Sequence, residues 1–323
     1  MDFAHPLYRV RDLFYNRDIP VETADRFCRI RISKTVCNGE MGDGMKQGYR
    51  LICMALGLFL LLAGTGCSAA PEAVEAGGIL WFCQPASGGT LCVEPAYDSL
   101  GDTGRIFRSD LSGKVIVPEE IDGKPVTELA DRAFFESEET TEIVLGEEIR
   151  TIGKECFYGC TALRTAELPA SVRELGENAF SKSGIERLSF PESLRTIGRE
   201  DSLPFYGCQS LKEILVDPEN LYYFSDGGVL FSKKKKTLLC YPAAKQGSSY
   251  VIPDTVEKLA PGSFWMCTNL ETLTIPASVR KMECRFADCH ALKMLMVPED
   301  RLEDDQEHPA LEGFTGKLEG YTR

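Results

Sequence analysis

Few residues in this 323-residue chain are suited to acid–base, nucleophilic or metal chemistry. The sequence has three histidines, and only His290 and His308 follow residue 66, which restricts catalytic triads and histidine metal sites. It contains no GxSxG nucleophile elbow, phosphate-binding loop, dinucleotide fingerprint or zinc-binding histidine pair. Carboxylates are abundant, at 49 positions, but so acidic a chain singles out no catalytic pair. We therefore predict a protein that is not an enzyme and has no cofactor, with a carboxylate hydrolase as the third hypothesis.

Cysteine is the remaining reactive residue, at 13 positions. Cys284, Asp288, Cys289 and His290 could be proposed as metal ligands. However, Cys289 belongs to a set of cysteines that recur at one position of a repeat: Cys160, Cys208, Cys267 and Cys289. Cysteines in such a series behave as small buried hydrophobic residues. We predict stacked core thiols and no metal site, although stacked neighbours such as Cys267 and Cys289 could reach one another.

Cys83 and Cys92 form a candidate disulfide. In the segment CQPASGGTLC, Ser87-Gly88 suits a two-residue turn because glycine accepts a positive φ. That turn places the two cysteines opposite each other at a non-hydrogen-bonded pair, with α-carbons roughly 4.5 Å apart, which is within disulfide reach. A turn at Gly88-Gly89 instead shifts the register and separates them.

Residues 45–67, MKQGYRLICMALGLFLLLAGTGC, have the layout of an export signal. Lys46 and Arg50 precede an apolar stretch from Leu51 to Ala63, which is shorter than the ~20 residues of a spanning helix. The segment resembles the signal of bacterial lipoproteins, although Gly64 stands where that family prefers Leu. The resemblance implies that Cys67 is acylated and becomes the mature N-terminus. Cleavage near Ala69 or Ala70, giving a secreted protein, is the alternative.

Residues 1–44 have no place in such a signal. They are rich in Arg and lack hydrophobic periodicity, so we predict that they are untranslated, with Met45 as the start. The alternative is a cytoplasmic leader, which would make the protein a single-pass membrane protein. Residues 68–78 are predicted to be a linker.

A repeat of 22 or 23 residues occupies most of the remaining chain. Apolar residues recur at intervals of 23 at three positions of the unit: Phe134, Phe157 and Phe180; Leu129, Ile152 and Leu175; Val126, Ile149 and Val172. A unit this short cannot bury its own apolar residues, so successive units must stack on one another. The sequence therefore predicts a mainly β solenoid over residues 115–300. An apolar-x-apolar pair in each unit, often ended by Pro, forms one parallel sheet face, and the segment up to Phe and Cys forms a helical turn.

These motifs resemble the BspA-like class of leucine-rich repeats, which pairs an "Ile-Pro" strand with an "Ala-Phe-x-x-Cys" turn. In this chain Cys156 replaces the usual Ala, and Leu203-Pro204 are two extra residues that should bulge. Residues 217–252 interrupt the period, and two apolar runs around Lys233–Lys236 predict an inserted hairpin. The resemblance also implies a strand-rich N-terminal cap at 79–114. Residues 301–323 are predicted to be an acidic, irregular cap or tail.

A solenoid of this kind offers one sheet face to solvent, made from the middle residue of each strand. The residues predicted to point outward are Val144, Glu167, Ser189, Leu215, Val251, Thr274 and Met296. Repeat proteins bind along such extended faces. A formal charge of −13 excludes nucleic acid as a partner, because a polyanion requires clustered Lys and Arg.

The resemblance implies a lipid-anchored surface protein that binds an extracellular protein or glycan, with possible adhesion to host or microbial surfaces. An envelope scaffold without an external ligand is the second hypothesis.

Overall fold

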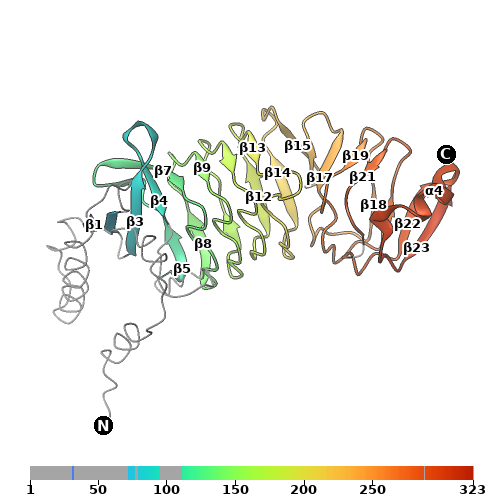
Figure 1. The fold of residues 1–323 in the computed structure, drawn as a ribbon, viewed down its shortest axis with the longest axis horizontal. Coiled ribbons are helices and arrows are strands. Elements are labelled where there is room, and N and C mark those ends of the chain that lie inside the picture. The colour runs from blue at the N-terminus through green and yellow to red at the C-terminus, as the bar shows by residue number, and fades with distance from the viewer. Residues whose placement is uncertain (1–30, 33–71, 77–78, 95–110, 287, 323) are drawn as a thin grey trace, which may run out of the picture.

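A computed structural model describes residues 31–32, 72–76, 79–94, 111–286 and 288–322 (Figure 1). The described chain coils into an elongated solenoid whose strands run side by side along its length. Each coil buries alternate strand residues, so that Ile143, Leu188 and Leu273 are between 0% and 2% exposed. The inward residues of each coil pack against the inward residues of the next coil. This stacking is the physical reason for the repeat.

One strand of each coil forms what we call the front ladder. Its strands pair in parallel in three segments, β10-β8-β5, β12-β14 and β18-β20-β22-β23. Their bounds are β5 (Gly113–Ile116), β8 (Thr140–Val144), β10 (Thr165–Ala166), β12 (Arg187–Phe190), β14 (Glu213–Val216), β18 (Ser249–Val251), β20 (Thr272–Thr274), β22 (Met294–Pro298) and β23 (Lys317–Tyr321). The mainly β solenoid and its parallel front sheet are thus confirmed.

A second parallel ladder, the side ladder, was not predicted from the sequence. Its bounds are β7 (Lys124–Leu129), β9 (Thr151–Ile152), β11 (Glu174–Leu175), β13 (Thr196–Ile197), β17 (Thr237–Cys240), β19 (Lys258–Leu259) and β21 (Lys281–Met282). Most of these strands are only two residues long, too short to show an alternating pattern. The fold therefore has two sheet faces, where the sequence predicted one.

The turns that carry Phe and Cys are not helices. Cys160 N–H donates to the Phe157 carbonyl at 3.3 Å, and the same turn recurs at Cys208 with Phe205. Within the described residues, helix is confined to four short segments: η1 (Ser87–Gly89), η2 (Glu299–Arg301), α4 (Leu302–Gln306) and η3 (Pro309–Leu311). The predicted helical turn is therefore wrong, because alternate amides of this segment, such as those of Phe157 and Gly159, donate to the next coil instead of continuing a helix.

The predicted inserted hairpin is confirmed. β16 (Val229–Ser232) and β17 run antiparallel around the lysine turn, and β15 (Tyr223–Asp226) adds a third strand against β16. β16 lies between two core clusters: Leu230 belongs to the cluster on the N-terminal side, whereas Val229 and Phe231 belong to the other. Both faces of this strand are buried, which explains its uninterrupted apolar sequence.

Strands precede the first front strand. β1 (Arg31–Ile32) pairs with β2 (Glu72–Ala76), and β2 runs antiparallel to β3 (Ile79–Pro85), which pairs with β4 (Leu91–Glu94). β6 (Glu120–Ile121) forms a small hairpin with β7. β2 lies in residues that the sequence assigned to a linker. The indole of Trp81, fully buried, packs edge-on against Phe134 at 6.3 Å, so these strands cover the end of the core.

The predicted register around Cys83 and Cys92 is wrong. β3 and β4 pair Cys83 with Val93 and Gln84 with Cys92, one residue away from the predicted alignment. Three residues, Ser87–Gly89, form the turn, because Gly88 and Gly89 both adopt a positive φ, of 73° and 83°. Adjacent pairs of a ladder point to opposite faces, so this register directs the two cysteine side chains away from each other.

The C-terminal residues are more regular than predicted. α4 and two 3₁₀ segments follow β22, and β23 then pairs in parallel with β22 over five residues. Ala310 is buried, and Leu302, Leu311 and Phe314 pack against the second core cluster. This segment therefore closes the end of the solenoid as a regular cap, where the sequence predicted an acidic, irregular cap or tail.

Candidate binding surface

The seven residues predicted to face outward lie in register on the front ladder. Val144 pairs with Ile116, and Ser189 pairs with Leu215. Further along, Val251, Thr274 and Met296 occupy three consecutive strands. Glu167 follows Ala166, which pairs with Ile143, so it continues the same row. We call this set of residues, together with Ile116, the front row.

The front row is accessible to solvent. Ile116 is 59% exposed, Leu215 45% and Val251 66%. Glu167 and Ser189 are also exposed, and the other three residues are half-buried. These apolar side chains share the outward side of the front ladder, in its three separate segments, where a partner can cover them.

A second outward row, two residues earlier in each strand, flanks the front row. On the N-terminal side it is charged and paired across strands: Lys114 contacts Glu142, and Arg187 contacts Glu213, both at 2.7 Å. On β18, β20 and β22 the flanking residues are Ser249, Thr272 and Met294. The front face therefore carries ion pairs between strands on its N-terminal side, whereas its outward residues on β18, β20 and β22 are uncharged.

Ile116 was missed in the sequence as a front-row residue. It is the middle residue of Val115-Ile116-Val117, which precedes a Pro, so it satisfies the apolar-x-apolar pattern. Val115 and Val117 are each 1% exposed, whereas Ile116 points outward. The apolar-x-apolar pattern could therefore have identified Ile116, but this triplet lies at the predicted boundary between the cap and the first repeat.

The recurrent cysteines are core thiols that donate hydrogen bonds. The Sγ of Cys160 donates to the Phe134 carbonyl at 3.1 Å, and that of Cys208 donates to the Phe180 carbonyl at 3.0 Å. Burial raises the pKa of both thiols from 9.0 to about 12. They remain protonated at neutral pH and are poor nucleophiles and metal ligands.

The two histidines offer no catalytic grouping. The Nδ1 of His308 accepts a hydrogen bond from the Ala310 amide at 3.1 Å and so caps η3, while His290 is exposed on a turn. Among the described residues, no cluster of three His, Cys, Asp or Glu side chains is arranged to hold a metal ion.

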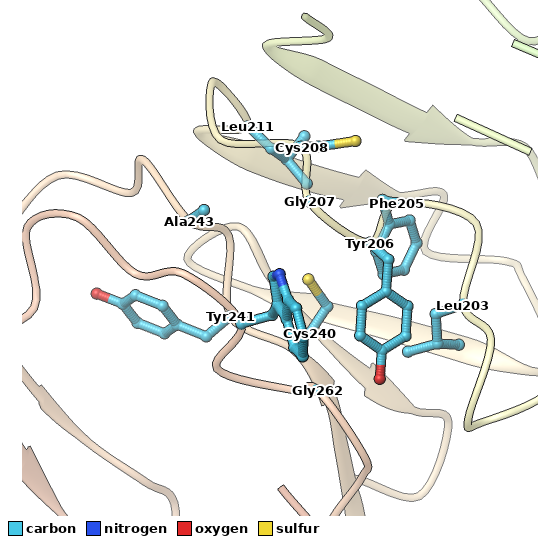
Figure 2. Close-up of a pocket in the computed structure, with 11 residues that line it drawn as sticks. Leu203, Phe205, Tyr206, Gly207, Cys208, Leu211, Cys240, Tyr241, Ala243 and Gly262 are labelled. Atoms are coloured by element: carbon cyan, nitrogen blue, oxygen red, sulfur yellow. The ribbon is translucent and has the colours of Figure 1, made fainter. Parts of the chain in front are cut away.

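A small cavity lies where the inserted segment meets the regular coils. Its wall combines Leu203, Phe205, Tyr206, Gly207, Cys208, Leu211, Cys240, Tyr241, Ala243, Gly262 and Trp265 (Figure 2). The rings of Tyr206 and Trp265 meet edge to face at 5.4 Å. Burial raises the pKa of the Tyr206 phenol to about 12, so the polar groups here are neutral. The wall of this cavity contains no Asp, Glu, His, Lys or Arg.

The aromatic residues of the insertion divide between packing and exposure. Tyr223 packs edge-on against Phe190 at 6.1 Å, and its hydroxyl donates to the Arg195 carbonyl. Tyr222 and Phe224 are 46% and 37% exposed, and Leu221 is 75% exposed. Tyr223 therefore anchors the insertion to the solenoid, while Leu221, Tyr222 and Phe224 are exposed to solvent.

The lipid-acceptor candidate Cys67 and the predicted signal at 45–67 lie outside the described residues. In the part of the chain that the structure does describe, no helix has the length and hydrophobicity needed to cross a membrane.

A six-copy match to the BspA-type leucine-rich repeat region covers residues 127–237 and 240–307, more than half of the chain. The chain belongs to the BspA-type leucine-rich repeat family. The matched BspA-type repeats include all of the front ladder from β8 to β22. This family membership confirms the resemblance drawn from the Ile-Pro and Phe-x-x-Cys motifs.

Several solved structures resemble this BspA-type protein. A leucine-rich repeat protein from Eubacterium ventriosum is 22% identical, over 68% of this chain and 70% of that one, with a TM-score of 0.49. The pneumococcal vaccine antigen PcpA is 22% identical, over 69% of each chain, with a TM-score of 0.48. A leucine-rich cell surface protein from Faecalibacterium prausnitzii is 15% identical, over 80% and 96%, with a TM-score of 0.40. No curated protein matches the chain.

Proposed function

We propose that this BspA-type protein is exported, is anchored to the bacterial membrane by a lipid on Cys67, and binds an extracellular protein or glycan through its front row. Adhesion to host surfaces or to other microbes is the biological role that such binding would serve. The export signal at 45–67 supports the location, and membership of a repeat family supports binding as the activity.

One observation carries the binding proposal: apolar side chains stay exposed on the outward side of the front ladder while the residues next to them in the chain are buried. Leu215 is 45% exposed while Ile214 beside it is 0% exposed, and Val251 is 66% exposed beside Ile252 at 1%. Folding gains nothing from leaving these side chains in water, and a partner that covers them would gain about 25 cal/mol for each Å² of apolar surface buried.

The site chemistry favours binding over catalysis. The buried thiols of Cys160 and Cys208 carry raised pKa values, and the front row has no histidine, cysteine or lysine. Glu167 is the one ionisable residue of the eight in the front row. A single exposed carboxylate lacks the partner that general acid–base catalysis requires.

A solid-phase binding screen tests this proposal. The full chain would be presented to immobilised extracellular matrix proteins, mucin and neighbouring cell-wall proteins. A double variant, Leu215→Glu with Val251→Glu, should lose at least tenfold in affinity for the ligand found, because it places a charge on the exposed apolar surface of the front ladder on each side of the insertion.

Lys281→Glu is the matched control, since it lowers the net charge by the same two units at an exposed position of the side ladder, opposite Lys258. It should bind like the wild type. Equal binding by all three proteins would refute the front row as the site. Capture of cell-wall proteins alone would favour the envelope scaffold over adhesion.

Mass spectrometry of the native N-terminus tests the anchor. A diacylated Cys67 as the first residue is the expected result, and Cys67→Ala should release the protein into the medium. A peptide from residues 1–44 in the mature protein would overturn the start at Met45. An unmodified N-terminus beyond Cys67 would overturn the lipid anchor.

A further inference from the structure

One position of the repeat, three residues after the stacked ring, alternates between serine and cysteine in the first coils. The residues there are Ser137, Cys160, Ser183 and Cys208. The hydroxyl of Ser183 and the thiol of Cys208 lie 3.6 Å apart, so side chains at this position contact their neighbours in the next coil. A serine between two cysteines leaves each thiol without a thiol next to it in the stack.

The last two repeats break this alternation. Cys267 and Cys289 occupy the same position in consecutive coils, three residues after Phe264 and Phe286. Along the part of the ring series that the structure describes, they are the one pair of cysteines in adjacent coils at this position.

The coils that carry the two cysteines are aligned. β20 and β22 pair Leu273 with Leu295, an offset of 22 residues, and the same offset relates Cys267 to Cys289. Aligned residues of neighbouring parallel strands lie about 4.8 Å apart, inside the 4.4–6.8 Å range of α-carbon separations found in disulfides. The rings of Phe264 and Phe286, one turn earlier in the same coils, are 5.9 Å apart.

The side chains also point toward each other. The Sγ of Cys289 donates to the Phe264 carbonyl at 2.6 Å, which directs it into the preceding coil. The interaction between the two thiols raises the pKa of Cys267 and lowers that of Cys289, so the two side chains lie close together.

From this geometry we propose that Cys267 and Cys289 form a disulfide that joins the last two repeats when the protein folds in an oxidising compartment. The oxidant is a small or protein disulfide. The thiolate of one cysteine attacks one of its sulfurs and releases one thiolate. The second cysteine, once deprotonated, attacks the sulfur of the first in this mixed disulfide and releases the second thiolate. Overall, two thiols lose two protons and two electrons, and the oxidant is reduced to two thiols.

Burial sets the order of events. Cys267 is 1% exposed and Cys289 is 2% exposed, so an oxidant cannot reach them in the closed solenoid. Exchange must take place before the last coils close, or during their transient opening. Once formed, the bond is shielded from reductants in the same way.

Tryptic peptide mapping tests this proposal, because each cysteine falls in a separate fragment. Cys267 lies in 259–280, Cys284 in 282–285 and Cys289 in 286–293. The full chain would be unfolded and refolded in glutathione buffers that range from reducing to oxidising. Free thiols would then be trapped with N-ethylmaleimide before digestion without reductant. The expected product is fragment 259–280 joined to fragment 286–293, with Cys284 alkylated.

Thermal melts provide a second readout. Reductant present during refolding should lower the Tm of the wild type by about 5 to 10 °C, as expected for opening a loop of roughly 20 residues. Cys289→Ala should show no such dependence on reductant. Cys208→Ala is the matched control, since its neighbour in the stack is a serine, and it should keep the full dependence.

Alkylation of both Cys267 and Cys289 in every oxidising buffer would overturn the proposal. A bond between Cys284 and Cys289 would do the same, because it would place the link within one coil. Neither result bears on the front row, so the failure of this proposal and the failure of the proposed binding function are distinguishable.

Discussion

The first half of the solenoid, residues 111–216, and the second half, residues 249–322, share one backbone plan but present different surfaces. In the first half the outward residues beside the front row form ion pairs, as in Lys114 with Glu142. In the second half β18, β20 and β22 present only uncharged outward residues: Ser249, Val251, Thr272, Thr274, Met294 and Met296. The inward residues fix the coil, which leaves the outward residues free to differ.

The two halves also differ in how their rings stack. Phe157 lies between Phe134 and Phe180, at 5.2 and 5.0 Å and at interplanar angles of 16° and 20°. Phe286 contacts the ring of Phe264 at 5.9 Å and 44°. Near-parallel offset stacking on both faces gives the first half the denser aromatic column, so we expect it to be the more stable half.

The attachment of the insertion to the first half depends on Asn220, which is fully buried. Its Nδ2 donates to the carbonyls of Pro191, Glu192 and Leu194 at 2.8 to 3.3 Å, and its Oδ1 accepts from the amides of Tyr222 and Tyr223. Asn220→Asp would aim a carboxylate at three carbonyl oxygens, so we expect it to lower the free energy of unfolding by about 5 kcal/mol.

Asn269→Asp is the control for that variant. The Nδ2 of Asn269 also donates to two carbonyls, those of Ala244 and Lys245, but the residue is exposed, so the expected loss is below about 1 kcal/mol. Denaturant melts measure both. Similar losses would show that Asn220 does not hold the insertion to the first half.

The aromatic column predicts unequal effects in the two halves. Phe157→Ala should lower the free energy of unfolding by about 3 to 5 kcal/mol, because both neighbouring rings lose a partner. Phe286→Ala should cost less, near 3 kcal/mol, and Glu167→Ala on the front row should cost almost nothing. Urea unfolding of the three variants would sharpen the comparison. A larger loss at Phe286 would reverse our ranking of the halves.

Close contact between coils differs as well. A Cβ on Gly176 would lie 2.4 Å from the Lys154 amide nitrogen and 2.5 Å from the Gly153 carbonyl carbon. Gly176→Ala should therefore destabilise the first half by about 2 kcal/mol. Ala260 stands at the same position of the second half, and Ala260→Gly should cost about 1 kcal/mol. A Tm for Gly176→Ala equal to that of the wild type would contradict this account of coil spacing.

Stability should also fall above about pH 9. The pKa of Cys160 and Cys208 is raised by burial to about 12, whereas the same thiols titrate near 9.0 when unfolded. Between these values the folded state binds more protons than the unfolded state, so stability decreases with rising pH, by at most about 1.4 kcal/mol per pH unit for each thiol. Melts of Cys160→Ser and Cys208→Ser from pH 8 to 11 should show a shallower decline. An unchanged slope would mean that these thiols are not the cause.

The regular coils were predictable because a packing constraint repeats at a fixed interval. Phe134, Phe157 and Phe180 mark the same place in successive coils, and any correct stacking must bring them together. The front row followed from the same register, since side chains alternate along a strand. The hairpin was predictable from two apolar runs around four lysines.

Features set by single positions were not predictable. The side ladder consists largely of two-residue strands such as Thr151–Ile152, which carry no periodic signal. The turn at Ser87–Gly89 depends on whether one glycine or two adopt a positive φ. That difference decides whether Cys83 pairs with Cys92, as predicted, or with Val93, as observed. Pairing of Lys317–Tyr321 with β22 depends on tertiary packing of a segment whose sequence lacks the repeat.

The most direct test of the front row is oxidative footprinting of the chain with and without the ligand found by the binding screen. Hydroxyl radicals oxidise exposed sulfur and aromatic groups, so Met294 and Met296 report on the uncharged end of the front face. Trp265 and Tyr222 are exposed elsewhere, at 38% and 46%. We predict that the ligand protects both methionines and leaves Trp265 and Tyr222 unchanged. Protection of Trp265 or Tyr222 with unchanged methionines would contradict the proposal that the sheet face is the binding surface.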